Sequence, residues 1–340
     1  MKKYFSALAT LVAAVCLLTS SSERRFTIFM IGDSTMANKS AYLKNPERGW
    51  GMALQGFFTE NVTVDNHALN GRSSRSFVLE GHWQKVYDAM KPGDYLVIQF
   101  GHNDEKGYIG DKRHTDPGLT FDDNLRMFAR AAQEKGATPI IMNAVVRRNF
   151  FDKTKADPTK TNLNDADDEA LRKNHWGTEQ INSDTLIETH GAYIVTPRFV
   201  AQQLRVPYVD ANKLTHDLEQ GLGIEGSRQL HMWIKPGEYG IEKGRKDNTH
   251  YNERGAHAVA SILVDAMAEV CPELKPYVRH YDYVVSAKGF GNYLSLQAAV
   301  DAVPAGQKAT ILVIDGEWSK PNTKGKKVKI DTYSTVKILK

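Results

Sequence analysis

Short apolar runs alternate with amphipathic stretches along most of the chain, and this order limits the fold more than any other feature. Five runs predict strands, at residues 26–31, 62–66, 94–100, 138–143 and 206–210. The stretches between them predict helices near residues 51–58, 75–90, 121–135 and 197–204, and a last helix that Asn252 caps and Cys271-Pro272 ends. Alternation of this kind is typical of βαβ units around a parallel sheet. We therefore expect an α/β domain.

The composition is that of a folded protein, with 340 residues of which 41% are hydrophobic and 25% charged. The net charge of +4 comes from the two ends of the chain, because residues 26–280 hold 31 Lys and Arg against 34 Asp and Glu. A nucleic-acid binder concentrates basic residues on its main domain. The distribution therefore predicts no nucleic-acid partner.

The N-terminal sequence "MKKYFSALATLVAAVCLLTSSSERR" has two lysines, an apolar run over residues 7–18 and then small polar residues. This run is too short for a membrane span and predicts a signal peptide over residues 1–22, hence a secreted or periplasmic protein without a membrane span. A buried N-terminal helix is the less favoured alternative. Cys16 does not favour a lipoprotein, because Val15 stands where lipid attachment needs a small residue.

The composition of the sequence changes at two places after the predicted signal peptide. Residues 151–177 are polar and weakly periodic, which predicts a surface insertion of the kind that shapes substrate sites. Near residue 280 the sequence turns aromatic, then Gly-rich, then Lys-rich. We therefore expect one domain over residues 23–280 and a separate segment over 281–340.

Four stretches bring chemistry to the predicted strand ends. They are "GDST" with Ser34, "NHALNGRSSRSF" with Gly71, "VIQFGHNDE" with Asn103, and "DNTHYNERGAHAVA" with Asp247 and His250. In a parallel sheet these positions fall at the carboxyl edge, where α/β active sites form.

The residue types suit acyl transfer. A serine needs a base to take its proton, the imidazole needs a carboxylate on its other nitrogen, and the tetrahedral oxyanion needs fixed donors. The nucleophile would be Ser34, the base His250 and the carboxylate Asp247. The N–H groups of Ser34 and Gly71 with the Asn103 amide would form the oxyanion hole. Each residue alone could equally be structural, as a turn residue, a helix cap or a local hydrogen bond. His67 and His102 compete as the base, but neither has an aspartate three residues before it.

Together these blocks, with "RRNF" after the fourth strand, resemble the SGNH (GDSL-type) hydrolases and are closest to rhamnogalacturonan acetylesterases, over roughly residues 26–275. The resemblance implies a flavodoxin-like, three-layer α/β/α domain. It also implies an esterase that removes acetyl groups from a pectic polysaccharide through an acetyl-Ser34 intermediate, alongside other pectin-degrading enzymes. Ser34, Asp247 and His250 would be catalytic, with Gly71 and Asn103 completing the oxyanion hole. No metal-ligand spacing appears, so no cofactor is expected.

Three residues are candidates for substrate contacts. Arg147, Arg148 and Trp176 lie near the expected site, where guanidinium groups suit carboxylates and an indole suits a sugar ring. Other substrates for the same machinery are acetylxylan, small esters and lipids. A carbohydrate-binding protein without catalysis is the alternative from another class.

The C-terminal segment has a resemblance of its own. Residues 283–317, "YVVSAKGFGNYLSLQAAVDAVPAG" followed by "ATILVIDGEW", are similar to the start of a pectin methylesterase β-helix. A solenoid needs about three stacked repeats to bury a core, so we expect an incomplete β-helix-like segment without a second activity. The segment would be either the remnant of a truncated fusion or a unit packed on the first domain.

Overall fold

A parallel sheet forms the centre of the molecule. The computed structural model describes residues 24–155 and 181–339, and the sheet has the strand order β3-β1-β4-β5-β6. Its strands are β1 (Phe26–Gly32), β3 (Val62–Asn66), β4 (Tyr95–Gln99), β5 (Thr138–Met142) and β6 (Tyr208–Val209). Counted along the chain, this is the order 2-1-3-4-5 of flavodoxin-like folds. The predicted fold class is confirmed, and each strand lies within two residues of its predicted bounds.

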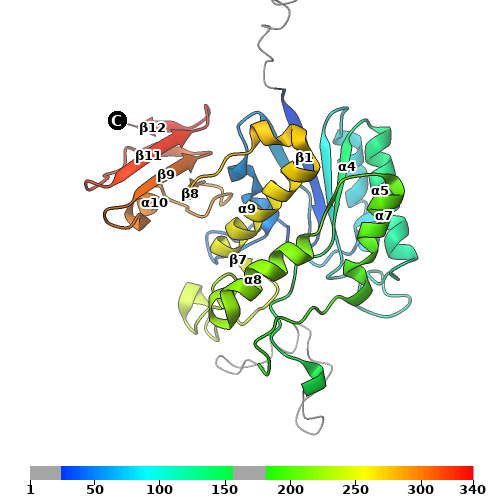
Figure 1. Cartoon of the computed structure of the whole chain (residues 1–340). Helices are drawn as coiled ribbons and strands as arrows, with labels where there is room; N and C mark the ends of the chain where they lie inside the picture. The colour runs from blue at the N-terminus through cyan, green and yellow to red at the C-terminus, as the bar shows by residue number, and fades with distance from the viewer. Residues whose placement is uncertain (1–23, 156–180, 340) are drawn as a thin grey trace, which may run out of the picture.

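Helices cover both faces of the sheet and bury alternate strand side chains (Figure 1). In β1, Ile28 and Met30 face one core, whereas Phe29 and Ile31 face the other. The first core is covered by α2 (Trp50–Ala53), η1 (Leu54–Phe57), α8 (Ala211–Arg228) and α9 (Glu253–Val270). The second is covered by α3 (Ser74–Leu79), α4 (His82–Ala89), α5 (Thr120–Glu134) and α7 (Thr196–Leu204). Because strand side chains alternate between faces, β1 can be apolar throughout and bury both layers.

Two helices differ from the prediction. The helix expected over residues 75–90 is split into α3 and α4, because Gly81 between them has a φ of 76° that interrupts helical geometry. α8 was not predicted, since its glycines lower helix propensity, and its backbone is kinked at Gly223. The remaining short elements are β2 (Glu47–Arg48), η2 (Lys153–Lys155), η3 (Gly191–Ile194), η4 (Glu238–Gly240), β7 (Tyr251–Asn252) and η5 (Pro272–Tyr277).

Residues 281–339 fold into a small unit that lies on the α9 side of the domain (Figure 1). It contains β8 (Tyr283–Val285), α10 (Leu296–Ala302), β9 (Lys308–Val313), β10 (Glu317–Ser319), β11 (Lys327–Thr332) and β12 (Lys337–Leu339). Its strands pair in parallel and enclose a small apolar core. The Tyr333 hydroxyl lies 2.8 Å from the Phe58 carbonyl and 2.9 Å from that of Gln55. The segment is thus bonded to the first domain, while its likeness to a pectin methylesterase stays a prediction.

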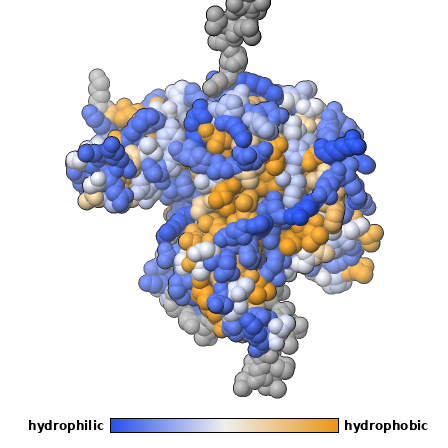
Figure 2. Space-filling view, in the orientation of Figure 1, coloured by the Kyte–Doolittle hydropathy of each residue, from blue (hydrophilic) through white to orange (hydrophobic). Residues whose placement is uncertain are grey.

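The visible face of this unit is largely hydrophilic, whereas apolar residues gather over the middle of the main domain (Figure 2). Among the described residues, no helix is long and apolar enough to cross a bilayer. The predicted signal peptide, most of the predicted insertion and Trp176 lie outside the described residues.

Candidate active site

The strand ends bring the predicted site residues to one cavity. Ser34 follows β1, Gly71 lies in the loop after β3 and Asn103 follows β4, while His250 immediately precedes β7. The cavity has a volume of about 450 Å³. It is lined by Ser34, Glu47, Asn70, Gly71, His102, Asn103, Lys106, Arg113, Arg245, Thr249 and His250.

A chain of hydrogen bonds joins the serine, the histidine and the aspartate. The Ser34 hydroxyl lies 2.8 Å from His250 Nε2, and His250 Nδ1 lies 2.8 Å from Asp247 Oδ2. Since an ionised carboxylate only accepts, Nδ1 carries the proton and Nε2 is free to accept the serine proton. The arrangement is that of a nucleophile, a general base and an orienting acid.

The backbone after Asp247 fixes this geometry. Asp247 Oδ1 accepts the N–H groups of Thr249 and His250, at 3.0 and 2.9 Å, so the carboxylate folds its own loop around the histidine. Asp247 is 1% exposed. Burial acts to raise its pKa, but His250 and Arg245 outweigh burial and hold the pKa of Asp247 well below its usual range. The carboxylate therefore stays charged beneath the histidine.

A tight turn presents the serine at the end of β1. Asp33 Oδ1 accepts the backbone N–H of Thr35 at 2.9 Å and its hydroxyl at 2.8 Å. The Thr35 carbonyl in turn accepts the Trp50 N–H at 2.8 Å. Asp33 and Thr35 are fully buried, whereas Ser34 between them is half-buried. The turn thus anchors its flanking residues and leaves the serine facing the cavity.

Three candidate donors for an oxyanion belong to residues that line the cavity. Within the described residues, the N–H groups of Ser34 and Gly71 donate to no protein acceptor. Gly71 has a φ of 74°, a conformation that favours glycine. The Asn103 side-chain amide donates one hydrogen to the Arg72 carbonyl at 3.2 Å, which orients it and leaves its second hydrogen available. These groups could together stabilise an oxyanion.

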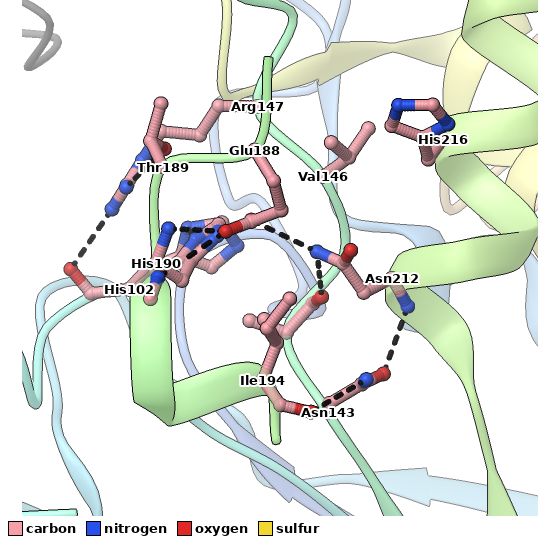
Figure 3. Close-up of polar contacts among 12 residues, drawn as sticks. His102, Asn143, Val146, Arg147, Glu188, Thr189, His190, Ile194, Asn212 and His216 are labelled. Carbon is pink, nitrogen blue, oxygen red and sulfur yellow. Dashed lines mark hydrogen bonds and ion pairs between the residues drawn. The ribbon is translucent and has the colours of Figure 1, made fainter. Parts of the chain in front are cut away.

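The two arginines predicted to bind substrate lie elsewhere. Arg148 is fully buried and donates to Ser227, Ile224 and Asn248, so it supports the loop that carries Asp247. Arg147 is 5% exposed and pairs with Glu105. It also donates to the Thr189 hydroxyl at 3.0 Å (Figure 3). Neither lines the cavity. Both side chains turn into the protein, and their guanidinium groups make internal contacts there.

His102 has partners of its own. Its Nδ1 lies 2.9 Å from His190 Nε2, and the His190 Nδ1 contacts the carboxylate of Glu188 (Figure 3). Burial is the main factor that lowers the pKa of His102 well below its usual range, and His190, Arg147 and Lys106 lower it further. Among the described residues, no group of three or more His, Cys, Asp or Glu side chains is placed to hold a metal ion.

Sequence reasoning missed three charged residues next to the catalytic set: Lys39, Glu47 and Arg245. Arg245 pairs with both Glu47 and Asp247, and Lys39 lies 3.0 Å from Glu47. No sequence motif marks Lys39 or Glu47, and the contact between Glu47 and Arg245 joins segments that lie 198 positions apart. Only the nearness of Arg245 to Asp247 in the sequence could have drawn attention.

Comparison with known proteins agrees with this geometry. Residues 28–263 match the family described as GDSL-like Lipase/Acylhydrolase. The chain therefore belongs to this family and is a carboxylic ester hydrolase.

Two relatives of the chain are named as rhamnogalacturonan acetylesterases. The chain is 35% identical over 268 residues to rhamnogalacturonan acetylesterase RhgT of Bacillus subtilis, a match covering 78% of this chain and 97% of the relative. It is 28% identical to a rhamnogalacturonan acetylesterase of Emericella nidulans, over 71% of this chain and 84% of that one. The crystal structure of YxiM from B. subtilis superposes with a TM-score of 0.52 at 23% identity, over 72% of this chain and 56% of that one. This last likeness supports the fold.

Proposed function

We propose that this protein is a serine esterase that removes O-acetyl groups from a pectic polysaccharide, with acetylated rhamnogalacturonan as its substrate. The observation that carries the proposal is the hydrogen-bonded chain Ser34–His250–Asp247 opening onto a polar cavity. The two relatives named rhamnogalacturonan acetylesterase support the choice of polymer. The leader-like N-terminal sequence supports a secreted or periplasmic enzyme, which would act alongside other pectin-degrading enzymes.

In the first step, Ser34 Oγ attacks the acetyl carbonyl carbon while His250 Nε2 takes the serine proton. Asp247 stabilises the imidazolium that forms. The carbonyl oxygen becomes an oxyanion held by the N–H groups of Ser34 and Gly71 and by the Asn103 amide. The intermediate then collapses, the bond from the acetyl carbon to the sugar oxygen breaks, and His250 returns its proton to that oxygen.

In the second step, water replaces the sugar. His250 takes a proton from the water as its oxygen attacks acetyl-Ser34, and the same donors hold the second oxyanion. Acetate leaves when the bond to Ser34 Oγ breaks and His250 reprotonates the serine. An exposed, polar cavity suits this step because water must reach the acyl group.

The cavity wall favours a short acyl group on a sugar. Among the described residues that line it there is no aliphatic or aromatic hydrocarbon side chain, whereas a long acyl chain would need an apolar groove. Lys106 and Arg113 also line the cavity. Arg113 Nε lies 3.5 Å from Asp111 Oδ1, whereas Lys106 forms no ion pair within the described residues. We infer that these two, rather than Arg147 and Arg148, contact uronate carboxylates of the polymer.

The test is acetate released from acetylated rhamnogalacturonan by the wild type and by Ser34→Ala, with acetylated xylan and a long-chain ester in parallel. We expect release from the pectic polymer by the wild type alone, with a folded but inactive variant. Release mainly from xylan or the long-chain ester would overturn the substrate and keep the mechanism. Binding of the polymer without any release of acetate would favour a carbohydrate-binding protein.

A further inference from the structure

A buried lysine lies beside the proposed nucleophile without lining the cavity. Lys39 is 7% exposed. Its Nζ lies 2.7 Å from the backbone carbonyl of Ser34, 2.7 Å from Asn70 Oδ1 and 3.0 Å from Glu47 Oε1. A lysine ammonium has three donor hydrogens. All three are used, and two of them connect the residue to loops of the proposed oxyanion hole.

These two contacts join separate segments of the hole. Ser34 belongs to the turn after β1, and Asn70 precedes Gly71 in the loop after β3. The two N–H groups proposed to hold the oxyanion therefore come from loops that share Lys39 as a common partner. A Cβ placed on Gly71 would meet nothing within 4 Å, so no neighbouring atom packs against that position. The Asn70–Lys39 contact joins the residue before Gly71 to the turn that holds Ser34, in addition to the bond from the Leu69 N–H to the Gly32 carbonyl.

The same lysine is linked to the acid of the catalytic set. Glu47 uses its second oxygen to pair with Arg245, and Arg245 also pairs with Asp247 Oδ2. Together with the bonds from Asp247 to His250 and from His250 to Ser34, these contacts close a ring around the serine.

The charges in this ring balance. Burial acts to raise the pKa of Glu47. The positive charges of Lys39, His250 and Arg245 outweigh burial and hold this pKa at about 2. Burial lowers the pKa of Lys39, and the charge of Glu47 opposes that change. Two cations, Lys39 and Arg245, thus face two carboxylates, Glu47 and Asp247. Groups of this kind can hold a fixed geometry in a partly desolvated site because each charge has a bonded partner.

We propose that Lys39 is a positioning residue. Its bonds to the Ser34 carbonyl and to Asn70 hold the Ser34 and Gly71 N–H groups, and its link through Glu47 and Arg245 fixes these groups relative to the Ser34–His250–Asp247 chain. The inference rests on the proposed esterase function. It gives Lys39 no contact with substrate, because the residue lies outside the cavity lining. Its effect should therefore fall on the rate of the chemical steps and leave the binding of small esters unchanged.

Substitution by methionine isolates this effect. Lys39→Met keeps the length of the side chain but removes its charge and donors, and Glu47 keeps Arg245 as a partner. We expect kcat for 4-nitrophenyl acetate to fall by roughly 10- to 100-fold with KM within about twofold, because small misplacements of catalytic groups cost up to about 10² in rate. Lys39→Arg retains charge and donors and should recover part of the loss. Lys44→Met, at an exposed lysine five residues away, is the matched control and should keep wild-type kinetics.

A low kcat can mean that every enzyme molecule is slower or that fewer molecules are active, and counting the serines that react with an inhibitor separates the two cases. A phosphonate ester that labels the serine should titrate Lys39→Met to the same final stoichiometry as the wild type, but more slowly. A kcat within twofold of the wild type would overturn the proposal. So would a loss of kcat matched by an equal loss of titratable sites, or a Lys39→Arg variant no faster than Lys39→Met.

The failure of this inference differs from the failure of the proposed function. An inactive Ser34→Ala with a fully active Lys39→Met would leave the esterase standing and remove Lys39 from the positioning of its site. An active Ser34→Ala would remove the nucleophile itself and overturn both proposals.

Discussion

Two histidines line the same cavity, and their surroundings differ in one decisive way. His250 has a carboxylate directly on Nδ1 and the Ser34 hydroxyl 2.8 Å from Nε2. His102 has a second histidine on Nδ1, and its nearest carboxylate in this chain of contacts, Glu188, lies one residue further away (Figure 3). The charge that a base acquires is therefore compensated at His250. It is not compensated directly at His102.

The environment of His102 also opposes protonation. Burial lowers its pKa well below the usual range, and the charges of Arg147 and Lys106 act in the same direction. Its backbone carbonyl lies 3.4 Å from the Arg147 guanidinium, and Asn103 is the next residue. A residue type common in catalysis can thus hold a loop rather than move a proton. We infer that His102 holds the loop that carries Asn103.

The largest expected effect tests this contrast directly. His250→Ala should lower kcat by roughly 10⁴- to 10⁶-fold, the usual loss when the base of such a triad is removed. His102→Ala should cost at most about 10²-fold, through displacement of Asn103. Steady-state rates on one acetyl ester measure both. Losses of equal size would end the distinction between the two histidines.

The two carboxylates sharpen the same comparison. Asp247→Asn leaves the acceptor for the loop N–H groups but offers His250 no charge, and an amide in this place favours the wrong tautomer. We expect kcat to fall by about 10⁴-fold. Glu188→Gln should cost less than about 10-fold, because Glu188 reaches the cavity only through His190 and His102.

Rates measured with purified, folded variants decide this second pair. A loss beyond about 10³-fold in Glu188→Gln would show that the His102 side takes part in the reaction. His190→Phe, which removes the link between Glu188 and His102, should behave like Glu188→Gln under the structural interpretation.

The fold was predictable because its signals are local. Strands β1 and β4 are short apolar runs, and Ser34 and Asn103 follow them closely in the sequence. The sheet topology itself therefore brings these two residues to one edge. Asp247 and His250 are three residues apart, and one turn of chain suffices to join them. The geometry predicted for these residues therefore needed no knowledge of long-range packing.

The missed features all depend on contacts between distant segments. Lys39 contacts Asn70, which lies 31 positions away, and Glu47 contacts Arg245, which lies 198 positions away. Neither contact leaves a periodic pattern in the sequence. Arg147 and Arg148 were predicted to face substrate because they follow a strand. Sequence alone does not show that Glu105 and Asn248, from other loops, hold them inside. The direction in which a long polar side chain turns is decided by partners that tertiary structure supplies.

The loops of the two histidines also hold aspartates whose pKa values are shifted in opposite directions. Asp247 has its pKa held down beside His250, whereas burial raises the pKa of Asp104, two residues after His102, to about 7. Hydrogen bonds from Ser74 and Thr115 act in the lowering direction but do not cancel the effect of burial. The loop of His102 therefore carries a buried group with a pKa near neutral pH.

The consequence for stability has a definite sign. Below pH 4, Asp104 is protonated in both the folded and the unfolded chain. Between pH 4 and 7 the unfolded chain releases this proton and the folded chain keeps it, so the contribution of Asp104 to the free energy of unfolding falls with rising pH and is lost above about 7. At about 1.4 kcal/mol per pH unit over the two units between pH 5 and 7, the loss between pH 5 and 8 is on the order of 3 kcal/mol.

Asp104→Asn isolates this smallest effect, because asparagine does not titrate. Urea unfolding at pH 5 and pH 8 gives the free energy of unfolding for the variant and the wild type. We expect the variant to gain roughly 3 kcal/mol relative to the wild type between the two pH values, whatever the substitution costs at pH 5. Asp88→Asn, at an exposed position on α4, controls for the loss of a surface charge. A constant difference between Asp104→Asn and the wild type would mean that Asp104 is ionised in the folded protein throughout. The contrast between the two sides of the cavity would then rest on the histidines alone.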